Sequence, residues 1–588
     1  HIYKNSLSLS FIAHKMLQNY KPITISIGIC LFISLWFIST NWLIIWRGLS
    51  FVLLAFILIS SFELIPAIVG LLYEQKKLRK RELVHSETKH WRPTYHFSPP
   101  QGWMNDPCGL YYKDGNYHLA FIHIPPDKNF DLKSPQSSYF SMLSNIERKR
   151  WGKATTTNLF DWQYRGDLIQ PATTPKSIPF SGSAIVDDKD AVKLIFTRVF
   201  FKNNQPLIQE QFLYNYEEEK LANDIAHSVP LIKKRFKLGL GDPKFRDPNV
   251  ILYQDSNGNR PFWLMTLSTG STVSFFKAAI EDLATTKWKK LSEFSIYSFF
   301  ESPIVECADL VKVPHKNKET YSYVLTGSHG FFPNTLATKT WYIIGDFDGK
   351  KFIPDKNSKR EILDFGPDFY AHQSWKNTEE PMVIAWLNNW KYAQEIPTHP
   401  WKGQMSIPRK LSIEKINDGL RLFQQAPELP DTFKDISASG RIKSQALNCF
   451  NIASSESAVV NGVQIESGLL ELAFSFEEIA EFRLDFRVNG DIKTSVSWSS
   501  IHQELILDRS KSGEFVPRGS TSFKAPFLAD DNFFRCKIYL DRSSVEVFAG
   551  KGKMVMSALI FPPENSQDLR FTNQGSTDLK QLSLTICK

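Results

Sequence analysis

The sequence has few cysteines, and none are spaced to hold a metal or to build a disulfide framework. Its 588 residues contain six Cys, with no CxxC pair, and no HExxH stretch occurs. These absences give no indication of a zinc site or a disulfide-stapled fold, so we expect no metal and no cofactor. N-x-S/T sequons are also missing, where a chain of this Asn content would carry roughly a few by chance. Their absence argues against a heavily glycosylated secreted protein.

No long stripe of one charge sign runs through the sequence. The net charge is +9, and part of the excess lies in a single basic run at residues 76–81. Elsewhere acidic and basic residues are mixed, which predicts a solvated surface and not a nucleic-acid-binding one.

Long apolar runs are confined to the N-terminal region. Residues 23–46 are 24 residues without a charged side chain, and about 20 suffice to span a bilayer. A second apolar stretch, residues 49–73, is interrupted by Glu63 and Pro66 and is a weaker candidate. We therefore expect residues 1–82 to be an N-terminal segment with one or two transmembrane helices, membrane-associated in either orientation. A secreted protein is the alternative.

Helical periodicity is scarce beyond residue 81, and short β-type runs separated by Gly, Pro, Asn and Asp replace it. This pattern predicts a propeller, barrel or sandwich. A change of composition at residues 427–432 (PELPDT) is typical of a linker, so we expect one all-β domain at 91–425 and a second at 440–588. Strands are expected at 117–124, 192–200, 262–267, 321–326, 341–344, 382–386, 482–488, 545–548 and 554–561.

Three short acidic motifs are the strongest indication of chemistry. Asp106 lies in WMNDPCG, Asp247 in FRDP and Glu306 in the apolar run PIVECA. Taken singly, the two aspartates are typical of turns, and the glutamate is typical of the exposed face of a strand. Partial burial of Glu306 would raise its pKa, as a general acid requires. Two carboxylates facing one sugar ring can cleave a glycosidic bond without a metal.

In combination, the motifs resemble glycoside hydrolase family 32, the invertases, inulinases and levanases. FSGS at 180–183, GDFDG at 345–349, IPTHPWKGQMSIPRKL at 396–411 and DRSSVEVF at 541–548 follow in the order of that family. The resemblance covers about residues 91–588. It implies an all-β fold, a five-bladed β-propeller followed by a C-terminal β-sandwich, preceded here by the hydrophobic helical segment.

The resemblance also implies a role for each carboxylate. Asp106 would be the nucleophile, Glu306 the acid/base and Asp247 the stabiliser of the transition state. A fructose subsite would be lined by Asn105, Cys108, Phe180, Ser181, Arg246, Trp386 and Trp390. One or both of Trp386 and Trp390 would form an aromatic wall, a surface that suits the C–H faces of sugars, although Trp390 is equally compatible with core packing.

The resemblance fails in one region. The family usually has Asn where this chain has Cys108, and Gln, which contacts fructose, where it has Ile122. An aliphatic side chain cannot make that hydrogen bond. The family's pattern then stays absent until Trp151. Residues 120–150 are therefore either a genuine divergence that rebuilds the wall of the site or the product of a wrong splice or frame.

The sequence thus predicts a retaining hydrolase that releases fructose from sucrose or from the non-reducing end of inulin or levan. A fructosyltransferase using the same covalent intermediate is one alternative. A catalytically impaired, membrane-tethered carbohydrate-binding paralogue is the other.

Overall fold

The computed structural model describes most of the chain beyond residue 87. The described residues are 88–126, 146–202, 205–216, 225–233, 244–254, 260–296, 304–329, 339–356, 358, 360–416, 419–430, 446–452, 457–476, 479–513, 515–573 and 579–587. The expected transmembrane stretches within residues 1–82 lie outside this set. Among the residues in it, no helix is both long and apolar enough to cross a membrane.

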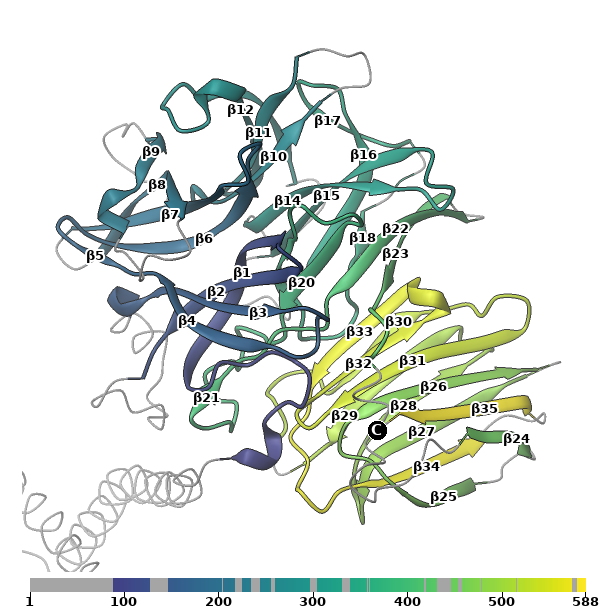
Figure 1. Ribbon diagram of the computed structural model, residues 1–588. Coiled ribbons are helices and arrows are strands. Elements are labelled where there is room, and N and C mark those ends of the chain that lie inside the picture. Colours follow the sequence, from purple (N-terminus) through teal and green to yellow (C-terminus); the bar gives the residue numbers. More distant parts are fainter. Residues whose placement is uncertain are drawn as a thin grey trace, which may run out of the picture. The chain divides into compact units, whose positions relative to one another are not determined.

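The first part of the described chain forms five sheets, antiparallel apart from one short parallel pair, which are the blades of a propeller (Figure 1). Blade 1 contains β1 (Gly102–Lys113), β2 (Asn116–Ile124), β3 (Arg150–Thr156), β4 (Gln163–Ile169) and β21 (Trp401–Lys402). Blade 2 contains β5 (Ala172–Thr173), β6 (Lys176–Val186), β7 (Val192–Lys202), β8 (Gln205–Tyr216) and β9 (Val229–Ile232). Blade 3 contains β10 (Arg246–Tyr253), β11 (Phe262–Thr269), β12 (Thr272–Ala279) and β13 (Lys289–Ser295).

Two further blades complete the ring. Blade 4 contains β14 (Val305–Pro314), β15 (Tyr321–His329), β16 (Thr340–Phe347), β17 (Phe352–Pro354) and β18 (Glu361–Ile362). Blade 5 contains β19 (Tyr370–Ser374), β20 (Met382–Trp386), β22 (Arg409–Ile416) and β23 (Gly419–Gln425). Short 3₁₀ turns lie at η1 (Lys89–Trp91), η2 (Ile146–Arg148), η3 (Ile225–His227), η4 (Ile280–Asp282) and η7 (Gly550–Gly552).

The ring is closed by backbone pairing between distant parts of the chain. β21 pairs parallel with β1, joining Gly102 to Trp401 and Trp103 to Lys402. The innermost strands β1, β6, β10, β14 and β19 contact one another in that order, and β19 returns to β1. Closure of this kind protects sheet edges and brings the starts of the five innermost strands together.

The second part of the described chain is a β-sandwich of two antiparallel sheets (Figure 1). One contains β24 (Ala446–Ile452), β35 (Leu579–Cys587), β26 (Gly468–Ser475), β31 (Phe533–Asp541), β32 (Ser544–Ala549) and β33 (Met554–Leu559). The other contains β25 (Ser457–Gln464), β34 (Asp568–Asn573), β27 (Glu481–Asn489), β28 (Ile492–Ser499), β29 (Glu504–Lys511) and β30 (Ser522–Pro526). Alternate apolar side chains of both sheets meet in one core, which includes Leu472, Phe482 and Val547.

A buried ionic network joins the propeller to the sandwich. Arg409 of β22 is 0% exposed, and its Nη2 donates to Asp364 Oδ2, Glu546 Oε2 and Ser557 Oγ, each at 2.8 Å. His96 contacts Asp541 Oδ2 at 2.8 Å and Glu546 Oε1 at 3.0 Å. Asp541 in β31 and Glu546 in β32 therefore bind side chains that come from outside the sandwich, namely His96 and Arg409.

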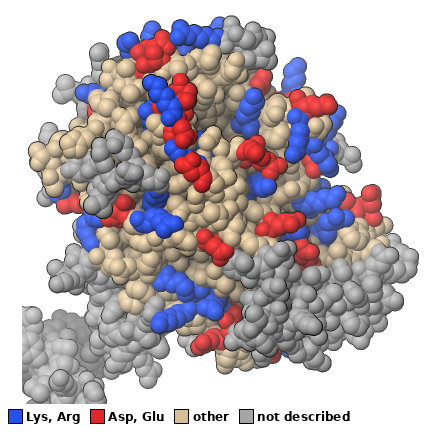
Figure 2. Space-filling model, viewed as in Figure 1, with Lys and Arg blue, Asp and Glu red and all other residues tan. Residues whose placement is uncertain are grey.

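The expected all-β class, with a propeller followed by a sandwich, is confirmed, and each expected strand overlaps an observed one, although the strand expected at 554–561 ends at Leu559. The helical N-terminal part of that expectation falls outside the described residues. Basic and acidic side chains are interspersed on the face shown in Figure 2, as the mixed charge of the sequence indicated.

Candidate active site

The innermost strand of every blade carries a β-bulge at the same level. The antiparallel register shifts between Met104 and Pro107 in β1, and between Arg246 and Asn249 in β10. The equivalent shifts in β6, β14 and β19 lie at 179/182, 306/309 and 370/373. A bulge leaves residues outside the ladder and re-aims their side chains. The residues inside these bulges or at their edges include Asn105, Asp106, Phe180, Ser181, Arg246, Asp247 and Glu306.

Hydroxyl groups of the preceding blade hold three of these bulges. The backbone N–H of Asp247 donates to Thr197 Oγ1 at 3.0 Å, and that of Ala371 donates to Ser328 Oγ at 3.0 Å. The N–H of Ala308 donates to Ser268 Oγ at 3.2 Å. Each hydroxyl lies on the strand that follows the innermost strand of its blade, and it satisfies an amide that the bulge removed from the ladder.

Three bulge residues also adopt an uncommon backbone conformation. Asp247, Cys307 and Ala371 have φ values of 61°, 51° and 53°. Residues other than glycine visit this left-handed region infrequently, and they do so chiefly where the surrounding structure enforces it. The left-handed backbone conformation thus helps to set the direction of the side chains in the bulges of blades 3, 4 and 5.

Asp106 is held by two side chains that the sequence analysis grouped with it. Asn105 Nδ2 donates to Asp106 Oδ1 at 2.9 Å, and Ser181 Oγ donates to Asp106 Oδ2 at 2.7 Å. Trp103 Nε1 in turn donates to Asn105 Oδ1 at 2.9 Å, which fixes the orientation of the amide. One carboxylate oxygen is therefore oriented from blade 1 and the other from blade 2.

Asp247 is the most buried of the three acids, at 3% exposure. The backbone N–H of Cys307 donates to its Oδ2 at 2.9 Å, and Arg246 Nε lies 3.7 Å from the same oxygen. Burial raises the pKa of Asp247 to about 6, against the opposing effect of the Arg246 guanidinium, and the charge of Asp106 acts in the same direction as burial. Asp106 and Asp247 are thus close enough to interact electrostatically.

Glu306 is partly buried, as its apolar sequence context predicted, with 18% of its side chain exposed. Arg246 Nη2 donates to Glu306 Oε1, and the hydroxyl of Tyr370 donates to Glu306 Oε2. The neighbouring Cys307 places its Sγ 3.8 Å from Asp106 Oδ2. Arg246 links Glu306 to Asp247 and Cys307 links Asp247 to Asp106, so three acids distant in sequence converge on one location.

Aromatic rings lie beside this location. Trp386 is fully buried and packs with Trp103, Tyr370 and Cys307, with the partly buried Trp390 against the cluster. Ring centroids are 6.0 Å apart between Trp103 and Trp390, which stack, and 4.7 Å apart between Trp386 and Trp390. Both predicted tryptophans therefore belong to one cluster, and only Trp390 keeps an exposed part.

Cys108 lies in a different environment from the other predicted site residues. It is 0% exposed and packs in an apolar cluster with Ile122 and Trp151. Burial raises the pKa of its thiol well above the usual value, and the charges of Asp106 and Asp247 add to this effect. The thiol is thus close to the acids but within the packed wall of blade 1.

Two residues at this location were not singled out from the sequence. Tyr370 is the first residue of β19, and nothing in the sequence around it indicated a hydrogen bond to Glu306. Lys149 is 5% exposed, and its Nζ lies 4.5 Å from the centroid of the Phe180 ring. It follows the stretch in which the family pattern is missing, so no motif pointed to it.

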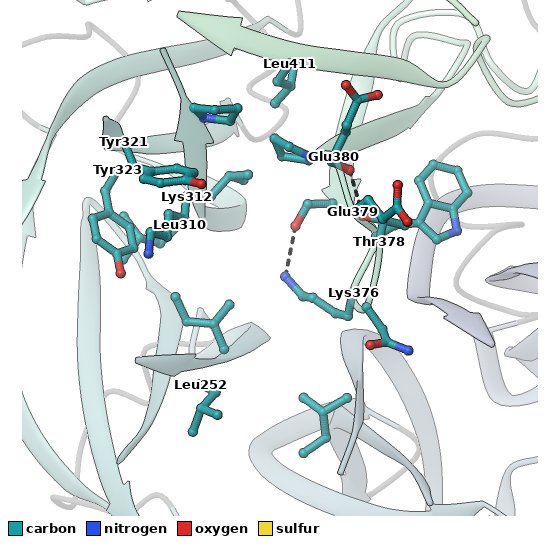
Figure 3. A pocket seen from close by; sticks show the side chains of 18 of the residues that line it. Leu252, Leu310, Lys312, Tyr321, Tyr323, Lys376, Thr378, Glu379, Glu380 and Leu411 are labelled. Carbon is teal, nitrogen blue, oxygen red and sulfur yellow. Dashed lines mark hydrogen bonds between the residues drawn. The ribbon is translucent and has the colours of Figure 1, made fainter. Parts of the chain in front are cut away.

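A separate hollow of 1180 Å³ opens at the other ends of the innermost strands (Figure 3). Leu252 near the end of β10 and Leu310 in the second half of β14 line it, whereas the acids lie at the starts of the same strands. Lys376 reaches toward its base, where Nζ donates to Asn249 Oδ1 at 2.8 Å and Ser374 Oγ at 2.9 Å. The hollow does not include the three acids.

Three carboxylates from separate propeller blades, linked through Arg246 and Cys307 and bordered by tryptophans, form the kind of site with which glycoside hydrolases act. The family model described as "Glycosyl hydrolases family 32 N-terminal domain" matches residues 96–426, and the one described as "Glycosyl hydrolases family 32 C terminal" matches residues 438–586. The chain belongs to glycosyl hydrolases family 32.

Individual relatives agree with this assignment. An extracellular exo-inulinase of Aspergillus ficuum is 29% identical over 531 residues, which cover 82% of this chain and 92% of that protein. A levanase of Bacillus subtilis is 27% identical and covers 84% of this chain and 70% of its own. The crystal structure of an exo-inulinase from Aspergillus awamori superposes with a TM-score of 0.69 at 25% identity, covering 85% of this chain and 98% of that one.

Proposed function

We propose that the protein is a retaining β-fructofuranosidase that releases fructose from sucrose or from the non-reducing end of inulin or levan. Asp106 attacks the anomeric carbon of the fructosyl unit and forms a covalent fructosyl-enzyme. Glu306 protonates the departing oxygen and then, as a base, activates the water that hydrolyses the intermediate. Asp247 accepts hydrogen bonds from neighbouring hydroxyls and offsets the positive charge that develops in the transition state.

One observation carries the proposal: the convergence of Asp106, Asp247 and Glu306 through Arg246 and Cys307. The names of the relatives, exo-inulinase and levanase, supply the substrate class. Asn105, Ser181 and Arg246 orient carboxylates that act on the sugar, while Phe180 and Trp390 offer it aromatic surface. We assign Cys108 and Trp386 to the wall behind that surface.

The test is fructose release from sucrose and from inulin by the full-length chain. Asp106→Asn and Glu306→Gln should each lose at least 1000-fold in kcat, because each removes a group that reacts. Glu504→Gln, which removes a carboxylate from a surface pair with Lys524, is the control and should match wild type. Equal activity in the control and the two site variants would refute the assignment.

The same assay separates the alternatives. Longer oligosaccharides formed at high sucrose would identify a fructosyltransferase, since the intermediate would then pass to a sugar and not to water. Binding of sucrose without turnover in the wild type would identify a carbohydrate-binding paralogue.

Two further assignments follow from the sequence. We propose functional units at residues 91–425 and 440–588, supported by the separate sheets and by the two matched regions. We also propose that residues 23–46 attach the protein to a membrane, on the strength of their length and lack of charge. Alkaline carbonate extraction tests this: release of the full chain into the supernatant would favour the secreted alternative.

A further inference from the structure

Lys149 is a buried cation for which the described part of the chain offers no ion-pair partner. It lies between η2 and β3 and is 5% exposed. Among the residues that the structure describes, its ammonium contacts the face of Phe180 at 4.5 Å, but no hydrogen-bond acceptor or carboxylate lies within bonding distance of it. Lysine is almost never fully buried unless it is paired.

The surroundings of Lys149 make that lack of a partner costly. Burial lowers the pKa of its ammonium to about 8, opposed by attraction to Asp106 and Asp247 and assisted by repulsion from Arg246. Burial of an ammonium is unfavourable unless other groups replace the hydration that it loses. A ligand that accepts hydrogen bonds from the ammonium would offset this loss.

The position of Lys149 indicates what that group is. Phe180 immediately precedes Ser181, whose hydroxyl donates to Asp106 Oδ2 at 2.7 Å. The ammonium therefore lies beside the bulge of β6, next to the carboxylate assigned as nucleophile. A sugar that reacts with Asp106 would bring its hydroxyl oxygens to this side of the site.

The side chain of Ile122 lacks the hydrogen-bond donor that is expected at its position, and the ammonium of Lys149 can supply one. Ile122 is 1% exposed and packs with Cys108 and Trp151, and it occupies the position at which the resemblance implies a glutamine that contacts fructose. Blade 1 thus offers an aliphatic side chain where a hydrogen-bond donor is expected. The lysine ammonium has three donors and no acceptor, so it can fill this role from the adjacent segment.

We propose that Lys149 is a specificity-determining residue of the sugar site, donating hydrogen bonds to hydroxyls of the fructosyl unit in place of the polar side chain absent at Ile122. The proposal rests on the proposed function. It also favours a genuine divergence of the sequence at Ile122 and Lys149 over an error of splicing.

The test measures sucrose binding by titration calorimetry in the full chain carrying Glu306→Gln, in which turnover is blocked. Adding Lys149→Met should weaken binding about tenfold to hundredfold, the effect of losing a hydrogen bond from a charged group. Lys149→Arg should restore part of the affinity. Lys153→Met is the matched control: Lys153 is also buried in blade 1, but its Nζ bonds to Tyr216 at 2.9 Å, so affinity should be unchanged.

A second variant separates sugar contact from structural support. Ile122→Gln added to Lys149→Met should recover affinity, because the amide restores a donor from the neighbouring strand. Binding by Lys149→Met within twofold of its parent would overturn the proposal, as would an equal loss in Lys153→Met. If the wild type releases fructose and Lys149→Met keeps its KM, only the role of Lys149 fails, whereas a wild type that neither binds nor cleaves sucrose refutes the proposed function itself.

Discussion

Replacing Arg409 with methionine should destabilise the protein by about 3–5 kcal/mol, the usual cost of removing one partner from a buried ion pair. The guanidinium is 0% exposed and donates to two carboxylates, one from each side of the contact between propeller and sandwich. Methionine fills a volume similar to that of arginine but cannot donate a hydrogen bond to either carboxylate.

The two carboxylates that bind Arg409 keep different partners when the guanidinium is removed. Glu546 keeps His96 as a second partner at 3.0 Å. Asp364 keeps Ser557 and the N–H of Gly366 at 2.8 Å, but it loses the cation at 2.8 Å, with only 1% of its side chain exposed. Asp364 is therefore left as a buried carboxylate without its ion-pair partner, and the destabilisation comes from that charge more than from lost packing.

Urea unfolding followed by tryptophan fluorescence measures the effect. At a slope near 3 kcal/mol per molar urea, the loss corresponds to a midpoint lower by about 1–2 M. Lys410→Met is the control, because this neighbour in β22 pairs with Glu380 at 2.7 Å with 43% of each side chain exposed. Such a pair contributes about 0–1 kcal/mol. Equal midpoints for the two variants would refute the view that the buried network joins the two parts of the chain.

Three further outcomes are expected. Fructose release should fall as pH drops through about 6, because burial raises the pKa of Asp247 to about 6 and protonation removes its negative charge; this limb should be absent from the residual pH profile of Asp247→Asn. Burial alone would lower the pKa of His96, but hydrogen bonds to Asp541 and Glu546 raise it from 6.5 to about 9. Its stabilisation is therefore complete below pH 6.5 and lost as pH rises through about 9, so urea midpoints taken from pH 6 to 9.5 should decline in wild type and flatten in His96→Gln. Tyr370→Phe should lower kcat/KM for sucrose about tenfold to hundredfold with an unchanged urea midpoint, because it removes a hydrogen bond to a charged group at the site.

The strands and the three acids could be predicted because their causes are local. Alternating apolar residues and frequent turn residues mark strands in the sequence itself. The hairpin between β1 and β2 is an example, where Asp114 and Gly115 both adopt the positive φ that such a tight turn requires. Asp106 and Asp247 were visible for the same reason, since each lies in a short motif.

The contacts between distant segments could not be predicted in this way. Arg409 and Glu546 lie in two of the motifs on which the resemblance was based, yet neither motif indicates that they meet. No strand or site was predicted at Tyr370, and Lys149 follows a segment without a recognisable pattern. Both become visible only when ring closure places blade 5 and the start of β3 around the acids.

The five bulges explain why so much of the site depends on this closure. A regular strand would direct alternate residues to the two faces of its blade, whereas each bulge directs residues toward the position that the innermost strands share. The amides freed in this way are bound by Thr197, Ser268 and Ser328 from the neighbouring blade. Blades 2, 3 and 4 therefore each fix the bulge of the blade that follows. The precision of the site comes from contacts between blades, and these exist only once the propeller has closed.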